Sequence, residues 1–280
     1  MDRVKLLSPA KINIGLRVWR KREDGYHDIE TVFHEVKLFD EIEMEISDEI
    51  EFETNSDEIP RGFENLCLKA VRIFFESFGI HSGVRIYLKK RIPVGAGLGG
   101  GSSNSAAVLK GLNILFGVGA DDDLLSELGS LIGSDVPFFI KGGTAYATGR
   151  GEIIEPIEVK VPYKIVIVYP SVKISTSWVY GNLNLRSHDG EESLKKIVVE
   201  NIDKPDKLRE LVENDLEDVV FRYHPIVADI KEKLYEIGAV FSLMSGSGSA
   251  VFGFFEKVGE KEKEKILNAF SSKFSCYFIE

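Results

Sequence analysis

The chain has 280 residues, of which 44% are hydrophobic and 29% charged, proportions that exclude a disordered, collagen-like or low-complexity protein. At about 100 to 200 residues per domain, this length favours two modest domains. The 35 basic and 45 acidic residues give a net charge of −10, which opposes nonspecific binding to nucleic acid or to anionic membranes. Because no apolar run approaches the ~18 residues of a membrane span, we expect no membrane partner and a cytoplasmic location.

The first half of the chain begins with strand patterns. Along residues 11–18 every second side chain is apolar, which predicts a strand with one buried face. Lys11 and Asn13 then lie together on the opposite, exposed face. After a turn at Asp24 and Gly25, the alternation at residues 42–46 and 50–52 predicts further strands of an antiparallel meander.

Helix patterns and a glycine-rich loop follow. Apolar residues spaced between Leu66 and Phe78 share one face of a predicted helix, and Gly79 is suited to its C-terminal cap. The further elements expected up to residue 151 are a strand over 84–88, a loop at 95–101, helices over about 103–116 and 122–132, and a short strand from 142 that ends in a turn at 149–151.

The second half alternates strands and helices again. A buried strand is predicted over 164–169, and we place a domain boundary at about residue 155, which divides the chain into 1–155 and 156–280. Residues 181–205 are polar and without pattern, so we assign no structure there. The elements expected beyond them are a helix around 226–237, a strand to 244, a turn at 245–249, a strand through 255, a helix over about 260–270 and a strand over 274–279. Mixed antiparallel strands and helices indicate an α+β fold.

The loop at 95–101 holds five glycines in seven positions, between a strand and a helix. Bare backbone N–H groups and the positive end of the helix dipole make such a loop suited to nucleotide phosphates. The loop matches the dinucleotide pattern G-x-G-x-x-G, but the acidic Asp121 lies in a loop before a helix rather than at the end of a second strand. It also lacks the Gly-Lys-Ser/Thr of a Walker loop. We therefore reject both of these interpretations.

Two other segments accompany this loop. Residues 9–16 read Pro-Ala-Lys-Ile-Asn-Ile-Gly-Leu, and residues 244–250 read Met-Ser-Gly-Ser-Gly-Ser-Ala. In order and spacing, the three segments resemble the three motifs of the GHMP small-molecule kinases. The resemblance spans the whole chain and implies a first domain with the fold of ribosomal protein S5 domain 2, a ferredoxin-like second domain that contributes to the substrate site, and ATP and Mg²⁺ as cofactors.

The resemblance also assigns candidate residues. Asp135, in the sequence Gly-Ser-Asp-Val-Pro, matches the family's catalytic aspartate, although the residue itself could equally be a helix N-cap, as could Ser134. Lys11 matches the lysine that contacts this aspartate and would keep it ionised. The candidate ATP-binding residues are Asn65, Pro93, Gly95, Ala96, Gly97, Leu98, Gly99, Gly100, Gly101, Ser102, Ser103, Asn104 and Ser105.

Within the GHMP kinases, the first motif and the sequence Asp24-Gly-Tyr-His27 resemble the 4-diphosphocytidyl-2-C-methyl-D-erythritol kinases. Those enzymes phosphorylate the 2-hydroxyl of a cytidine-diphosphate-linked sugar alcohol in the non-mevalonate isoprenoid precursor pathway. Aromatic rings stack on a base and a histidine can read its polar edge. The candidate substrate-binding residues are Asn13, Tyr26, His27, Lys141, Tyr180, Ser245, Gly246, Ser247 and Gly248.

Several alternatives stay open at this point. The protein could be a homoserine or mevalonate type of GHMP kinase, or a non-catalytic binding protein of the same fold, although Lys11, Asp135 and the full glycine loop argue against the latter. The five histidines lack the spacing of a zinc site, and we assign no metal ligands. The expected assembly is a monomer or a weak homodimer.

Overall fold

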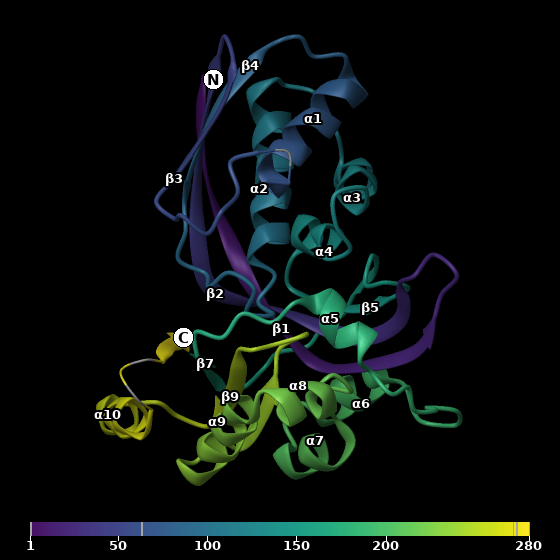
Figure 1. The fold of residues 1–280 in the computed structure, drawn as a ribbon, viewed down its shortest axis with the longest axis vertical. Coiled ribbons are helices and arrows are strands. Elements are labelled where there is room, and N and C mark those ends of the chain that lie inside the picture. Colours follow the sequence, from purple (N-terminus) through teal and green to yellow (C-terminus); the bar gives the residue numbers. More distant parts are fainter. Residues whose placement is uncertain (1, 63, 271, 273, 280) are drawn as a thin grey trace.

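The computed structural model describes residues 2–62, 64–270, 272 and 274–279. These residues form two β-sheets, one from the first half of the chain and one from the second, each covered by helices (Figure 1). The first sheet ends at Pro156 and the second begins at Lys164. This changeover supports our proposal of a domain boundary near residue 155. No helix in the described ranges is long and apolar enough to cross a membrane.

The first sheet is built on a long antiparallel hairpin of β1 and β2, which runs through the middle of the molecule (Figure 1). The other edge of β2 pairs with β4 at one end and with β5 at the other. The predicted meander is wrong for β3, which pairs in parallel with β4 and not with the preceding strand. The strands are β1 (Arg3–Lys21), β2 (His27–Ser47), β3 (Ile50–Thr54), β4 (Gly83–Lys89), β5 (Thr144–Thr148) and β6 (Ile153–Pro156).

Four helices pack beside this sheet: α1 (Leu66–Phe78), α2 (Gly100–Leu115), α3 (Asp122–Ser130) and α4 (Val136–Lys141). The predicted cap of α1 is confirmed, because Gly79 is left-handed and its N–H donates to the carbonyl of Phe75. Helix α2 begins three residues earlier than predicted, directly after Gly99, whose φ of 68° only glycine adopts readily. Helix α3 ends two residues earlier than predicted.

The second sheet is antiparallel, in the order β10-β7-β9-β8. Its strands confirm the predicted ones: β7 (Lys164–Tyr169), β8 (Phe241–Met244), β9 (Val251–Phe255) and β10 (Ser275–Ile279). The helices of this half are α5 (Thr176–Gly181), α6 (Leu194–Asn201), α7 (Pro205–Leu211), α8 (Glu217–Tyr223), α9 (Pro225–Glu236) and α10 (Glu260–Ala269). Our assignment of no structure to residues 181–205 is wrong at α6, which Ser193 caps and which buries Leu194, Ile197 and Val198.

Over residues 10–18, strand β1 is buried on both faces, which contradicts the prediction of one exposed face there. Lys11, Asn13 and Arg17 are each at most 3% exposed. The second half of the chain covers this face, since a Cβ added at Gly15 would lie 3.1 Å from both Leu194 and Val212. The polar face of β1 therefore lies between the two halves of the molecule.

Candidate active site

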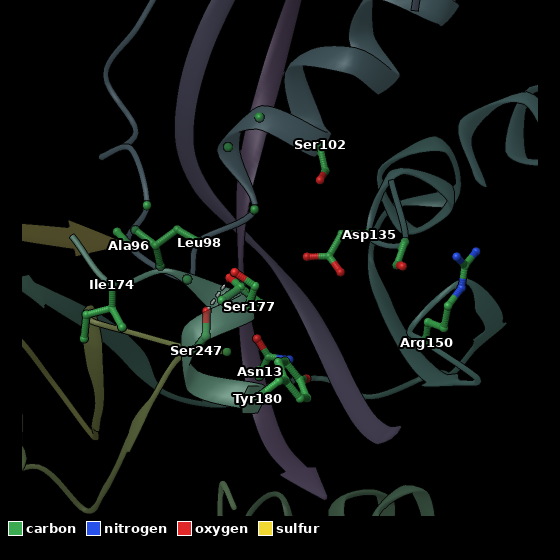
Figure 2. Close-up of a pocket in the computed structure, with 18 of the residues that line it drawn as sticks. Asn13, Ala96, Leu98, Ser102, Asp135, Arg150, Ile174, Ser177, Tyr180 and Ser247 are labelled. Atoms are coloured by element: carbon green, nitrogen blue, oxygen red, sulfur yellow. Dashed lines mark hydrogen bonds between the residues drawn. The ribbon is translucent and has the colours of Figure 1, made fainter. Parts of the chain in front are cut away.

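A cleft of about 890 Å³ opens between the two halves of the molecule. Figure 2 shows side chains from β1, the glycine-rich loop, α2, α5 and the turn after β8 directed into it. The candidate residues that line the cleft are Lys11, Asn13, Tyr26, His27, Pro93, Gly95, Ala96, Gly97, Leu98, Gly99, Gly100, Gly101, Ser102, Asp135, Tyr180, Gly246 and Ser247. The structure thus brings together most of the residues that the sequence motifs predict.

The polar centre of the cleft is a lysine and an aspartate from distant parts of the chain. Lys11 Nζ lies 3.7 Å from Asp135 Oδ2 and donates to Asn13 Oδ1 at 2.6 Å. The ammonium also lies 5.1 Å from the centre of the Phe33 ring, a cation–π distance. Burial lowers the pKa of Lys11, and the charge of Asp135 opposes this shift. The carboxylate therefore has a buried lysine side chain fixed close beside it.

Asp135 reaches the cleft because it does not cap its own helix. It occupies the N-cap position of α4, but its side chain accepts no capping hydrogen bond. The interpretation of this side chain as a structural cap is therefore wrong. Its carboxylate is 30% exposed and is free to contact a ligand in the cleft.

The glycine-rich loop is locked against the turn after β8. Gly95, Gly97 and Gly99 all have positive φ, which side chains disfavour. Gly97 also has no room for a side chain, because a Cβ there would lie 1.9 Å from the carbonyl oxygen of Ser245. Ser245 Oγ donates to the carbonyl of Gly97 at 2.9 Å, so the loop and the turn form one continuous wall.

The first turn of α2 divides the candidate ATP residues into two groups. Ser102 faces the cleft (Figure 2), whereas Ser103, Asn104 and Ser105 are buried and do not line it. Asn104 Nδ2 donates to Ser8 Oγ and to Asp40, and Ser105 Oγ donates to the carbonyl of Gly101. The helical period turns these residues inward, where they hold the helix start in place.

Four other candidates lie outside the cleft. Asn65 caps α1 through the N–H of Cys67 and donates to the carbonyl of Pro60. Ser245 and Gly248 are buried inside the turn after β8. Lys141 pairs with Asp123 at 3.0 Å and lines a separate cavity. The structure therefore does not bring Lys141 to the predicted substrate site.

The three aromatic candidates meet at one end of the cleft. The rings of His27 and Tyr180 lie 5.0 Å apart with an interplanar angle of 31°. These two rings are in mutual contact. No base fits between them at this distance, because two rings with a third stacked between them lie about 7 Å apart. Tyr26 is 54% exposed, and the guanidinium of Arg150 lies 4.8 Å from its ring centre. Burial lowers the pKa of His27, which favours the neutral imidazole.

Sequence reasoning missed three cations that line the cleft, Lys21, Lys90 and Arg150. Arg150 lies between two glycines in the turn after β5, which we interpreted only as a turn. Lys90 precedes the glycine-rich loop and forms a buried ion pair with Asp40 at 2.6 Å. The signal at Arg150 and Lys90 was a basic residue next to a glycine-rich or proline-containing turn, a pattern that also fits a solvated surface charge.

Comparison with known proteins supports the resemblance to the GHMP kinases. Residues 65–143 match the family described as GHMP kinases N terminal domain, and residues 198–276 match GHMP kinases C terminal. A 4-diphosphocytidyl-2-C-methyl-D-erythritol kinase of Chlorobium phaeobacteroides is 41% identical over 264 residues, which cover 94% of this chain and 92% of that protein. A protein of the same name from Enterococcus faecalis is 44% identical over 253 residues, 89% of each chain.

Solved structures agree with these relatives. The crystal structure of a 4-(cytidine 5'-diphospho)-2C-methyl-D-erythritol kinase has a TM-score of 0.81 and 34% identity, and the match covers 99% of this chain and 98% of that one. A homoserine kinase from Cytophaga hutchinsonii has a TM-score of 0.77 at 19% identity, covering 100% and 95%, and shows the fold alone. The two-domain kinase fold expected from the motifs is thereby confirmed. The chain belongs to the GHMP kinases and, within them, to the family of 4-diphosphocytidyl-2-C-methyl-D-erythritol kinases.

Proposed function

We propose that this protein transfers the γ-phosphoryl group of ATP to the 2-hydroxyl of 4-diphosphocytidyl-2-C-methyl-D-erythritol, a step of the non-mevalonate route to isoprenoid precursors. As a member of a kinase family it is an ATP-dependent phosphotransferase that acts on an alcohol group of a small molecule. The observation that carries the proposal is the ion pair of Lys11 and Asp135, which lines the same cleft as the glycine-rich loop.

Asp135 and Lys11 supply the groups that act on the acceptor. Phosphoryl transfer requires positioning and charge stabilisation more than covalent chemistry from the protein. In this mechanism the carboxylate of Asp135 accepts a hydrogen bond from the acceptor hydroxyl and takes its proton as the new bond to the γ-phosphorus forms. The bond from that phosphorus to the β–γ bridging oxygen breaks at the same time, and ADP leaves. The ammonium of Lys11 keeps Asp135 ionised and stabilises the charge that develops on the transferred group.

The glycine-rich loop and the start of α2 supply the phosphate site. Gly100, Gly101 and Ser102 form the start of α2 and line the cleft. The first N–H groups of a helix lack intrahelical partners and suit a phosphate. The oxygen donors of Ser102 and Asp135 line the same space, and Mg²⁺ prefers such hard oxygen ligands. These two residues would hold Mg²⁺ together with ATP, and the bound ion would neutralise phosphate charge. The donor set fits the ion.

The far end of the cleft supplies the site for the cytidine group. Tyr26, His27 and Tyr180 line this end, and their rings offer an aromatic surface on which a base can stack. Arg150 adds a cation beside Tyr26. The net charge of −10 favours a small-molecule substrate over nucleic acid or an anionic membrane as partner. A monomer or weak homodimer remains our proposal for the assembly.

The test is ATP consumption with a panel of acceptors. We expect turnover with 4-diphosphocytidyl-2-C-methyl-D-erythritol and values of kcat/KM at least about 100-fold lower for homoserine, mevalonate and galactose, because those acceptors cannot use the aromatic end of the cleft. A product phosphorylated at the 2-hydroxyl, identified by NMR, completes the assignment. Turnover of homoserine or mevalonate at the higher rate would overturn it.

A further inference from the structure

The segment between α7 and α8 is attached to β1, the strand that carries Lys11. The N–H of Leu16 donates to the carbonyl of Glu213 at 2.9 Å, and the N–H of Asp215 donates to the carbonyl of Leu16 at 2.9 Å. The Asp215 carboxylate accepts a third bond from the N–H of Val18. Asn214 is thus held parallel to β1 as a short extra bridge of that strand.

From this place the side chain of Asn214 reaches the turn after β8. It is 3% exposed, and its Nδ2 donates to the carbonyls of Met244 at 2.9 Å and Gly246 at 2.8 Å. Its Oδ1 accepts from the N–H of Leu216 at 3.0 Å. With both N–H groups and the oxygen engaged, the amide has one orientation, so it fixes the two carbonyls relative to β1.

A second buried side chain holds the start of the same turn. Glu217 Oε1 accepts from the N–H of Met244 at 2.8 Å, while Oε2 pairs with Lys231 at 2.6 Å. Burial raises the pKa of Glu217, and the charge of Lys231 opposes this shift. The two polar groups of Met244 are therefore bonded to two neighbouring side chains of one segment.

The turn that Asn214 holds touches the reacting groups. A Cβ added at Gly246 would lie 3.2 Å from Lys11 Nζ and 3.2 Å from Asn13 Oδ1. The preceding residue, Ser245, bonds to the carbonyl of Gly97 in the glycine-rich loop. A shift of Gly246 by a few tenths of an ångström would therefore change the space around the Lys11 ammonium.

We propose that Asn214 is a positioning residue for phosphoryl transfer, which sets the place of Gly246 against Lys11 and Asn13. Asn214 does not line the cleft, so it acts on the reaction only through the turn. The proposal rests on the role of Lys11 and Asp135 in the proposed function. It adds a residue from outside the glycine-rich motifs to the parts that the reaction needs.

The test compares Asn214→Ala with Asn113→Ala. Asn113 makes the same kind of contact far from the cleft, since its amide donates to the carbonyl of Ala120 and accepts from the N–H of the same residue. Both variants lose a side-chain amide that ties down backbone, so both should lower Tm. We expect only Asn214→Ala to lower kcat, by about 10-fold to 100-fold, since displacement of reacting groups by about 1 Å costs this much. Its KM for ATP should change less than its kcat.

Asn214→Ser provides a second variant, because a hydroxyl can still donate to one of the two carbonyls. It should fold and give a kcat between those of wild type and Asn214→Ala. A wild-type kcat in either folded variant, or an equal loss in Asn113→Ala, would overturn the proposal. Failure of both Asn214 variants to fold would also overturn it and leave Asn214 a purely structural residue. Lack of turnover by the wild type would instead refute the proposed function.

Discussion

At the scale of single residues, Asp135 stands apart because a buried lysine lies beside it and its side chain does not cap its own helix. We predict that Asp135→Asn lowers kcat by about 100-fold or more, since a positioned base contributes about 10² to 10⁴. The KM for the cytidine-linked acceptor should change by less than about threefold. Steady-state kinetics at saturating ATP test this expectation.

A matched control exists for this substitution. Asp123→Asn removes a carboxylate of the same kind, also paired with a lysine, but its side chain is 84% exposed and lies outside the cleft. This variant should keep its full turnover. Near-wild-type turnover in Asp135→Asn would remove the residue from the mechanism.

His34, next to the cleft residue Phe33, predicts how stability depends on pH. Burial lowers the pKa of His34 to about 4, from 6.5 for a free side chain, and its Nδ1 lies 2.7 Å from Thr144 Oγ1. Protons therefore bind the unfolded chain more tightly than the folded one. The free energy of unfolding is therefore not reduced by this histidine above pH 6.5. It falls as the pH drops from 6.5 toward 4, by up to about 3 kcal/mol.

Urea unfolding between pH 7.5 and 4 measures this loss. His34→Gln keeps a hydrogen-bonding group for Thr144 but does not titrate, so its unfolding free energy should fall less steeply with acid than that of wild type. His81→Gln, at an exposed position, should behave like wild type. Equal slopes for wild type and His34→Gln would contradict the prediction.

At the scale of elements, the glycine-rich loop depends on close packing against the turn after β8. Gly97→Ala places a Cβ 1.9 Å from the carbonyl oxygen of Ser245, at a φ of 79°. The loop and the turn must then separate. We predict that the KM for ATP rises about tenfold or more and that Tm falls.

Gly117→Ala separates the effect of positive φ from the effect of the clash between the added Cβ and its neighbours. Gly117 also has positive φ, at 61°, but nothing lies within 4 Å of an added Cβ. It should show only the backbone cost, about 1 to 2 kcal/mol of stability, with an unchanged KM for ATP. If both variants had the same KM, the close approach at Gly97 would be irrelevant to nucleotide binding.

Elements whose pattern is local were predictable from the sequence. Helix α1 with its glycine cap, the buried strand β7, the glycine-rich loop and the turn after β8 all follow from periodicity and turn residues, and the structure confirms them. Helix α6 was missed because its three buried residues lie within a short polar stretch, and their burial depends on contact with β1. The parallel pairing of β3 with β4 also depends on contacts between distant segments, which periodicity does not encode.

The same distinction holds for the site. Lys11, Asp135 and the glycines could be placed from motifs, whereas Arg150 and Lys90 could not, because a basic residue beside a turn is usually a solvated charge. Lys141 lies outside the cleft, where its ammonium pairs with Asp123. Which side chains of a helix or strand face the cleft is decided by what covers the other face.

At the scale of the whole molecule, the cleft needs both halves of the chain. His27 begins β2 of the first sheet, while Tyr180 belongs to α5 of the second half, and their rings meet at 5.0 Å. A base that stacks on Tyr180 must separate this pair or lie on its outer side. In the proposed function, the cytidine group therefore binds where the two halves of the chain meet.

This arrangement predicts the base specificity of the enzyme. Tyr180→Ala should lower kcat/KM for the cytidine-linked substrate by about 1 to 3 kcal/mol through lost stacking, with the KM for ATP nearly unchanged. Tyr87→Ala removes an exposed tyrosine on β4, outside the cleft, and should have no effect. A loss in ATP affinity equal to that for the cytidine substrate would mean that Tyr180 stabilises the whole cleft rather than the base site.

His27 should decide between cytidine and uridine. Cytosine carries an amino donor where the uracil ring carries a carbonyl acceptor, and a neutral imidazole can accept from that donor. Burial lowers the pKa of His27, so the imidazole is available as an acceptor at neutral pH. His27→Ala should therefore narrow the ratio of kcat/KM between cytidine- and uridine-linked substrates, mostly by loss on cytidine. An unchanged ratio in His27→Ala, or equal use of methylerythritol phosphates with and without the cytidine group, would show that this end of the cleft does not read the base.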